Sequence, residues 1–142
     1  MTNDALHLHY TVERDNFTAA GEASSNVKRI LKQLGMPPTV IRKVSIAMYE
    51  GEINMVIHAY GGDIDVDVSP QEIRMVLKDV GPGIPDVEKA MQEGFSTAPD
   101  SIRSLGFGAG MGLPNMKKYS DTMEIETEVG VGTTITMTVL VS

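Results

Sequence analysis

The 142-residue sequence has no cysteine and no tryptophan, and only 5% of its residues are aromatic. The absence of cysteine excludes a disulfide scaffold, a thiolate zinc site and a cysteine nucleophile. The scarcity of aromatic side chains argues against a surface on which nucleic-acid bases stack. Lysine and arginine number 12 against 19 acidic residues, for a net charge of −7, and no basic run could follow a phosphate backbone. We therefore expect no nucleic-acid partner.

Long apolar runs are also absent. No stretch approaches the roughly 20 apolar residues that span a bilayer, and the N-terminal residues lack the basic region and apolar core of a signal peptide. These features predict a cytoplasmic protein that has no membrane partner. Apolar residues make up 42% of the chain, which is enough for a core, and the length predicts a single domain over residues 1–142.

The spacing of apolar residues predicts an α+β fold. Alternation indicates a strand near residues 5–13 and hairpins over 63–79 and 123–139. Helical spacing indicates helices over about 18–34, 39–59 and 112–119, with Gly35 just past the first of them, and a short helix near 86–92. Because the helices fall between hairpins, we expect a two-layer sandwich with about three main helices on one face of a mixed, mostly antiparallel sheet of about five strands.

Half of the 14 glycines lie between Asp79 and Leu113. Asp79, Gly81 and Gly83 follow a predicted strand, where glycine lets the backbone approach a ligand closely, although a simple turn would show the same pattern. A second group leads directly into a predicted helix, and such a loop before a helix N-terminus suits phosphate; its members are Gly106, Gly108, Gly110 and Gly112. The long segment at about 85–110 predicts a lid or binding loop, the alternative being a surface insertion.

Glu50 and Asn54 lie four residues apart and therefore share one face of a predicted helix. A carboxylate and an amide oxygen there could activate a hydroxyl group and bind a hard cation such as Mg²⁺. A solvated polar face is the simpler interpretation, and it is the one that we expect for Glu52. We also expect a solvated face for two later lysines, Lys117 and Lys118. Gly51 costs about 1 kcal/mol relative to alanine inside a helix, which predicts a distortion or a close approach at that point.

Taken in order, these motifs resemble those of the GHKL (Bergerat-fold) ATPase superfamily. Glu50-x-x-x-Asn54 is similar to its N box and Asp79-x-Gly81-x-Gly83 to its G1 box. The G2 box is similar to the run Gly106-x-Gly108-x-Gly110-x-Gly112-Leu113. The G3 segment is similar to Gly130-x-Gly132-Thr133. The short chain and the run Asn54–Tyr60, which ends in His-Ala-Tyr, are similar to bacterial anti-sigma regulatory factors with serine/threonine protein kinase activity. The run Glu93–Thr97 resembles the switch-type kinases of that group.

The resemblance implies a Bergerat-type sheet that binds ATP or ADP together with Mg²⁺. Asp79 would accept a hydrogen bond from the adenine amino group, and Thr133 would support that contact through water. Asn54 would ligate Mg²⁺, and Glu50 would be the general base for a serine or threonine hydroxyl. The remaining nucleotide contacts would come from the glycine boxes and the residue that follows them: Gly81, Gly83, Gly106, Gly108, Gly110, Gly112 and Leu113.

The resemblance also implies partners. It implies phosphorylation of a small antagonist protein of the anti-anti-sigma type in a bacterial partner-switching pathway. A sigma factor or a phosphatase would be a further partner, and a homodimer is compatible with the resemblance. One alternative is a non-catalytic module that binds ATP or ADP and sequesters a sigma factor or activates a phosphatase. Another is a scaffold that binds no nucleotide.

Overall fold

The computed structural model describes residues 6–13, 16, 19–59, 61–84, 87, 91 and 112–141. The described elements follow the order that the apolar spacing predicts. They are β1 (Leu6–Val12), α1 (Glu22–Gln33), α2 (Pro38–His58), β2 (Gly62–Val68), β3 (Glu72–Asp79), α5 (Gly112–Tyr119), β4 (Thr122–Glu128) and β5 (Gly132–Leu140). The predicted short helix near 86–92 and the predicted lid at about 85–110 lie largely outside the described residues.

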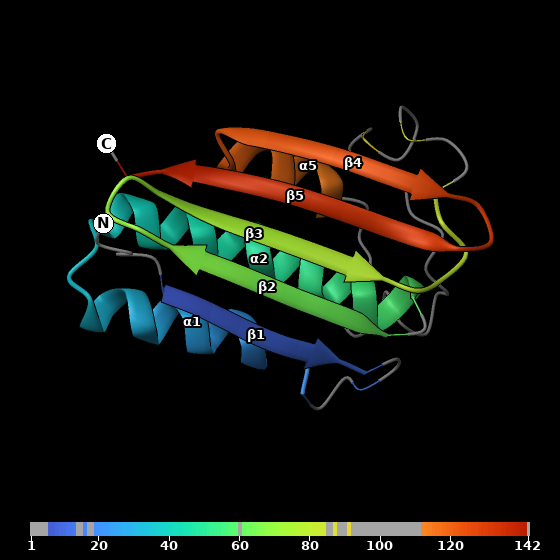
Figure 1. Ribbon diagram of the computed structural model, residues 1–142, viewed down its shortest axis with the longest axis horizontal. Helices are drawn as coiled ribbons and strands as arrows, with labels where there is room; N and C mark the ends of the chain where they lie inside the picture. The colour runs from blue at the N-terminus through green and yellow to red at the C-terminus, as the bar shows by residue number, and fades with distance from the viewer. Residues whose placement is uncertain are drawn as a thin grey trace.

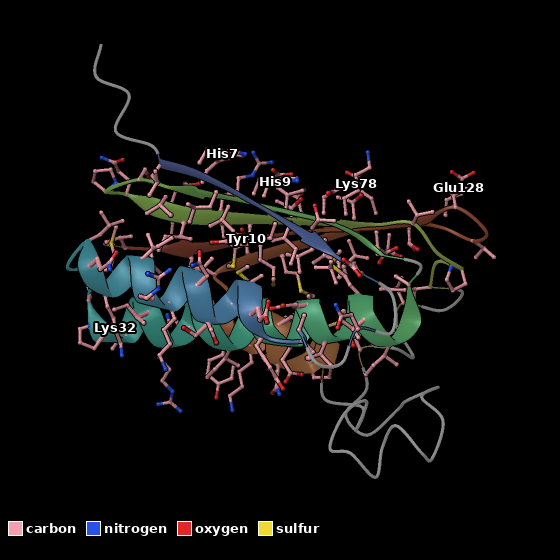
Figure 2. All side chains as sticks on the ribbon, turned by 90° about the horizontal axis from the view of Figure 1, so that it is seen from below. His7, His9, Tyr10, Lys32, Lys78 and Glu128 are labelled. Atoms are coloured by element: carbon pink, nitrogen blue, oxygen red, sulfur yellow. The ribbon has the colours of Figure 1, made fainter. Side chains whose placement is uncertain are left out.

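The five strands form one sheet in the order β1-β2-β3-β5-β4, and each of the four pairings is antiparallel. Figure 1 shows α1, α2 and α5 behind the sheet, and Figure 2 shows the same helices together below it. The other face of the sheet is open in the part of the chain that the structure describes. The predicted α+β two-layer sandwich is therefore confirmed.

The core lies between the sheet and the helices. On β2, Ile64, Val66 and Val68 point inward and are buried, while the aspartates between them point to the open face. This is the alternation expected of a strand with one buried face. The largest fully buried side chains include four methionines, which fill the core as apolar residues do: Met48, Met75, Met116 and Met137.

Glu52 departs from the predicted solvated face, because its side chain is only 3% exposed. The first turn of α1 has no cap from its own N-cap residue, Gly21, which adopts a left-handed φ of 94°. The Glu52 carboxylate instead accepts hydrogen bonds from the N–H groups of Gly21 (3.0 Å), Ala23 (3.2 Å) and Ser24 (3.0 Å), and from the Ser24 hydroxyl (2.8 Å). A helix N-terminus leaves such N–H groups without an internal partner. Glu52 therefore caps α1 from α2 and fastens the two helices together.

Glu52→Ala should destabilise the fold by about 3 kcal/mol, because several buried donors lose a charged acceptor at once. The matched control is Glu22→Ala, since Glu22 is exposed in the first turn of the same helix. There only the favourable interaction with the helix dipole is lost, about 0.5 kcal/mol. Urea unfolding of both variants measures the difference. Equal unfolding free energies would contradict the role of Glu52 as a cap.

Candidate functional site

Asp79 and Thr133 come together where β3 ends and β5 begins. The two strands are antiparallel neighbours, so the last residue of β3 lies beside the first residues of β5. The Thr133 N–H donates to Asp79 Oδ1 over 2.9 Å. Burial raises the pKa of Asp79, and the Thr133 hydrogen bond opposes this shift. The result is a partly buried carboxylate with one oxygen held by the backbone.

The segment after Asp79 is joined to the turn between β4 and β5. The Gly81 N–H donates to the Val131 carbonyl (3.1 Å), and the Gly130 N–H donates to the Pro82 carbonyl (2.9 Å). Gly83 has a φ of 76°, and a Cβ there would lie 2.6 Å from the carbonyl oxygen of Glu128. Glycine is therefore required at position 83 by both its backbone conformation and its close packing. The segments similar to the G1 box and the G3 segment thus lie side by side.

Thr127 is a residue of this region that the motifs did not single out. Its Oγ1 lies 2.8 Å from Thr133 Oγ1 and accepts the Ile84 N–H over 2.9 Å. Thr127 pairs directly with Thr133 in the register of β4 and β5. A signal for it exists in the sequence, because Thr127 continues the alternation of Met123 and Ile125 and is the polar member of that set. It ties the segment after Asp79 to the strand that carries Thr133.

A second group of predicted residues lies where α2 meets α5. A Cβ on Gly112 would lie 2.9 Å from Asn54 Nδ2 and 3.0 Å from its Oδ1, so only glycine lets the N-terminus of α5 come this close. The Asn54 Nδ2 is directed at Met116 Sδ, 3.9 Å away. Leu113, the next predicted residue, is buried against the core. The structure therefore brings Asn54, Gly112 and Leu113 together.

Glu50 lies one turn before Asn54 on α2 and is partly buried. Burial raises the pKa of Glu50, and a side-chain hydrogen bond from Asn115 opposes that shift. Asn115 belongs to α5, three residues after Gly112, so the same helix contacts both Asn54 and Glu50. The predictions from sequence did not include Asn115, because an asparagine in a helix has no signature of its own. A carboxyl group with a raised pKa is better suited to accept a proton near neutral pH than an exposed one.

Gly51 is a point of close approach between α2, β3 and α5. A Cβ on Gly51 would lie 2.3 Å from Leu77 Cδ2 and 3.1 Å from Met116 Cε. Leu77 is two residues before Asp79 on β3, and Met116 belongs to α5. Because Gly51 has no side chain, α2 packs directly against Leu77 of β3 and Met116 of α5. This contact lies between Glu50 and Asn54 along α2. The close approach predicted at Gly51 is confirmed.

Gly51→Val should destabilise the protein by about 1–3 kcal/mol, the usual cost of excess volume in a packed core. Arg42→Val is the control, because Arg42 is exposed on the same helix. It introduces the same β-branched side chain, and its expected cost is below about 0.7 kcal/mol. Thermal unfolding distinguishes the two variants. A Gly51→Val protein as stable as Arg42→Val would show that α2 does not rest on Leu77.

The remaining predicted residues lie outside the two groups described above. Gly106, Gly108 and Gly110 lie outside the described residues. Lys117 and Lys118 are exposed, as the sequence predicts.

Among the described side chains, no three His, Asp or Glu residues converge as metal ligands, and none of the described helices could cross a membrane. Two surface hollows of about 520 and 630 Å³ lie beside α1, lined by residues such as Tyr49 and Tyr10 rather than by Asp79 or Asn54.

Comparisons with known proteins identify the family of this chain. The sequence profile of the histidine kinase-like ATPase domain matches residues 15–139. The chain belongs to this family. The match spans both groups of residues described above, and it confirms the resemblance to GHKL ATPases.

The relatives that this chain resembles match nearly its whole length. The anti-sigma F factor of Geobacillus stearothermophilus is 29% identical over 136 residues, which are 92% of this chain and 88% of that protein. The serine/threonine-protein kinase RsbT of Bacillus subtilis is 31% identical over 137 residues, 94% of each chain. These relatives confirm the resemblance to the anti-sigma and kinase group.

A solved structure shares the fold. The chain is similar to the RsbU and RsbW domains of Rv1364c from Mycobacterium tuberculosis, with a TM-score of 0.60 and 20% sequence identity. The similarity covers 95% of this chain and about a third (32%) of that one.

Proposed function

We propose that this ATPase domain binds ATP and transfers its γ-phosphoryl group to a serine or threonine of a small antagonist protein. The observation that carries the proposal is the position of Glu50. This partly buried carboxyl group with a raised pKa lies one helical turn from Asn54, where the N-terminus of α5 packs against α2. A helix N-terminus favours a phosphate, and a nearby base can receive a proton from a hydroxyl group.

The two groups of residues would bind different parts of the nucleotide, one the adenine base and the other the phosphates. Asp79, held by Thr133, would accept the amino group of adenine, because an ionised carboxylate is an acceptor only and so selects a donor. Gly81 and Gly83 would bring the backbone close to the base. Gly112 and Leu113 would present the start of α5 to the phosphates, together with Gly106, Gly108 and Gly110 from outside the described residues.

The amide oxygen of Asn54 is suited to contact Mg²⁺. The Asn54 Nδ2 is directed at Met116, which leaves the amide oxygen as the atom available to a hard cation, and such cations prefer oxygen ligands. Asn54 would therefore hold the ion, whose chemistry is to neutralise charge on the phosphates. Glu50 would remain the group that orients the attacking hydroxyl and takes its proton. Transfer then depends mainly on positioning and charge neutralisation.

The names of two relatives support the proposed partners. One is called an anti-sigma F factor and another a serine/threonine-protein kinase, so we propose an antagonist protein of the anti-anti-sigma type as substrate. A sigma factor or a phosphatase is the proposed second partner. We further propose that residues 1–142 form a single domain with a nucleotide lid at about 85–110, and that this domain acts in the cytoplasm. A homodimer is compatible with this proposal.

Label transfer from γ-labelled ATP tests this function. The chain is incubated with Mg²⁺, labelled ATP and the proteins that co-purify with it or are encoded beside it. Transfer to a serine or threonine of one of them is expected. ATP binding without any transfer would favour the second candidate, a module that sequesters a sigma factor or activates a phosphatase through its nucleotide-dependent shape. Such a module is supported by the anti-sigma relatives.

Asn115→Leu should raise the pKa of Glu50 further, because the hydrogen bond that opposes the effect of burial is lost. The base must be unprotonated to work, so the acidic limb of the pH–rate profile should move to higher pH. Asn115→Gln keeps an amide donor and should restore part of the shift. NMR titration of the Glu50 carboxyl group gives the same information without relying on activity. A Glu50 pKa that is unchanged in Asn115→Leu would show that Asn115 does not position this carboxylate.

A further inference from the structure

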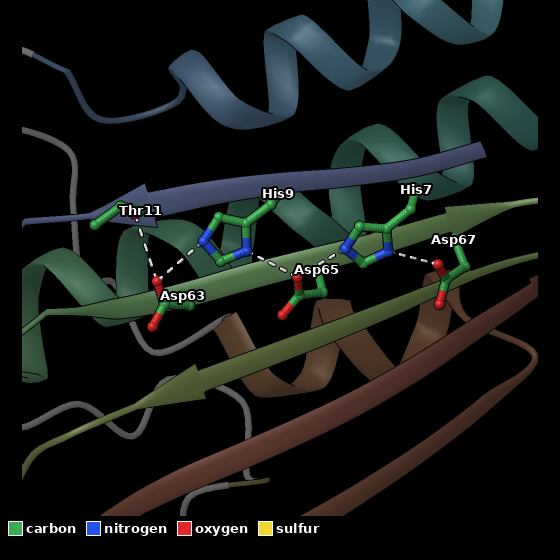
Figure 3. Close-up of polar contacts among 6 residues, drawn as sticks. All are labelled: His7, His9, Thr11, Asp63, Asp65 and Asp67. Carbon is green, nitrogen blue, oxygen red and sulfur yellow. Dashed lines mark hydrogen bonds and ion pairs between the residues drawn. The ribbon is translucent and has the colours of Figure 1, made fainter.

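The open face of the sheet carries a continuous row of histidine and aspartate side chains on β1 and β2 (Figure 3). The row consists of His7 and His9 on β1 and of Asp63, Asp65 and Asp67 on β2. In the register of the two strands His7 pairs with Asp67 and His9 pairs with Asp65. Strand alternation therefore places all five side chains on the same face, opposite the helices.

Every ring nitrogen of the two histidines faces a carboxylate oxygen. His7 Nδ1 lies 2.7 Å from Asp67 Oδ1, and His7 Nε2 lies 3.1 Å from Asp65 Oδ1. His9 Nδ1 lies 2.8 Å from the same Asp65 oxygen, and His9 Nε2 lies 3.3 Å from Asp63 Oδ1. An ionised carboxylate can only accept, and a neutral imidazole has only one N–H to donate. His7 can make both of its hydrogen bonds only when it is protonated, and the contact of His9 Nε2 with Asp63 is an ion pair that also requires a protonated ring.

The charges on β3 show which aspartate depends on the histidines. Arg74 pairs with Asp67, and Lys78 pairs with Asp63 in the β2–β3 register. Asp65 pairs with Val76 instead. Among the described residues, Asp65 forms ion pairs only with the two histidines.

The titration of these groups is consistent with the geometry. The pKa of His7 is raised above its ordinary value of 6.5, chiefly by the hydrogen bond with Asp67, and that of His9 chiefly by the hydrogen bond with Asp65. The His9 hydrogen bond in turn lowers the pKa of Asp65. For histidines with a raised pKa, the stabilisation is fully present below the unfolded value near 6.5 and is lost as the pH rises through the folded value.

We infer that the histidine–aspartate row is a proton-dependent latch that fastens β1 to the rest of the sheet. β1 is an edge strand, paired with β2 alone in the described sheet, so it has the fewest other restraints. With both histidines protonated, each carboxylate of the row is bridged across the two strands. When the histidines lose their protons as the pH rises, one ring nitrogen of each lacks a hydrogen and Asp65 loses both of its protonated partners. The attachment of β1 then weakens.

NMR titration of the imidazole C–H signals tests the latch in the intact chain. His7 and His9 are expected to titrate above 6.5, and Asp65→Asn should lower both pKa values because it replaces the carboxylate that the two rings share with a neutral amide. Glu124→Gln is the matched control. Glu124 lies in the same cross-strand row but three strand spacings from Asp65, about 14 Å, which exceeds the screening length of about 8 Å at physiological salt. Histidines that titrate at or below 6.5, or that respond equally to both variants, would overturn the inference.

Hydrogen exchange measures the consequence for the strand. Protection factors of β1 amides, corrected for intrinsic exchange, should fall as the pH rises through the titration of the two histidines. Those of β3, which is paired on both sides, should not change in parallel. In the His7→Gln, His9→Gln double variant the pH dependence of β1 should disappear, and both substituted side chains are exposed, so folding is retained. The same pH dependence of β1 in wild type and double variant would contradict the latch.

Discussion

Glu50→Gln is expected to slow phosphoryl transfer by about a hundred- to ten-thousand-fold, the range that a positioned general base contributes. Glutamine has nearly the same size as glutamate and keeps an oxygen acceptor for Asn115, so the packing of α2 on α5 should be retained. It cannot take a proton from a hydroxyl group. The rate of label transfer from ATP to the partner protein measures the effect.

Nucleotide affinity separates loss of chemistry from loss of binding. The Kd for ATP should remain unchanged in Glu50→Gln, because the proposed contacts of Asp79 and Asn54 do not involve Glu50. Glu124→Gln, an exposed substitution on β4, should retain both transfer and binding. Transfer at the wild-type rate by Glu50→Gln would remove Glu50 as the base and favour the non-catalytic module.

Asp79→Asn should weaken the binding of adenine nucleotides by about a hundredfold, which corresponds to about 3 kcal/mol for a buried, charge-assisted hydrogen bond that is lost. The amide oxygen can still accept the Thr133 N–H, so the end of β3 stays beside β5. The other oxygen is replaced by an NH₂ group, which faces the adenine donor with a donor of its own. Calorimetric titration with ATP gives the change in affinity.

Asp121→Asn is the control for this substitution. Asp121 also accepts a backbone N–H on β5, that of Leu140 over 2.7 Å. Leu140 lies seven residues from Thr133 along β5, about 23 Å away. Nucleotide affinity should therefore be unaffected in Asp121→Asn.

The nucleotide affinity of the wild type should also fall as acidification protonates Asp79. This loss should occur at a pH above the ordinary range of aspartate titration, because burial raises the pKa of Asp79.

The fold could be predicted from the sequence because its strands and helices have different apolar periods. Ile64, Val66 and Val68 alternate with aspartates, and this pattern fixes which face of β2 is buried. The glycines could be assigned only as places of close approach. The atoms that come close to them, such as Leu77 at Gly51 and Asn54 at Gly112, are distant in sequence and become visible only in the structure.

Glu52 shows why part of the site could not be predicted. Glu50 and Glu52 are two residues apart on one helix, and a sequence pattern treats both as polar positions. Their environments differ because the N–H groups of α1 surround Glu52, whereas Asn115 of α5 contacts Glu50. These partners depend on how three helices pack, a tertiary property that no spacing of residues encodes. Asn115 was missed for the same reason, whereas Thr127 could have been found from the alternation of β4.

The position of bound nucleotide tests the central proposal most directly. The backbone amide signals of the chain are followed by NMR during titration with ATP and Mg²⁺. We expect changes in two groups of signals, one at Asp79, Gly81 and Thr133 and the other at Asn54 and Gly112, with the second group depending on Mg²⁺. No change on addition of ATP, or changes confined to the hollows beside α1, would contradict the proposed nucleotide site.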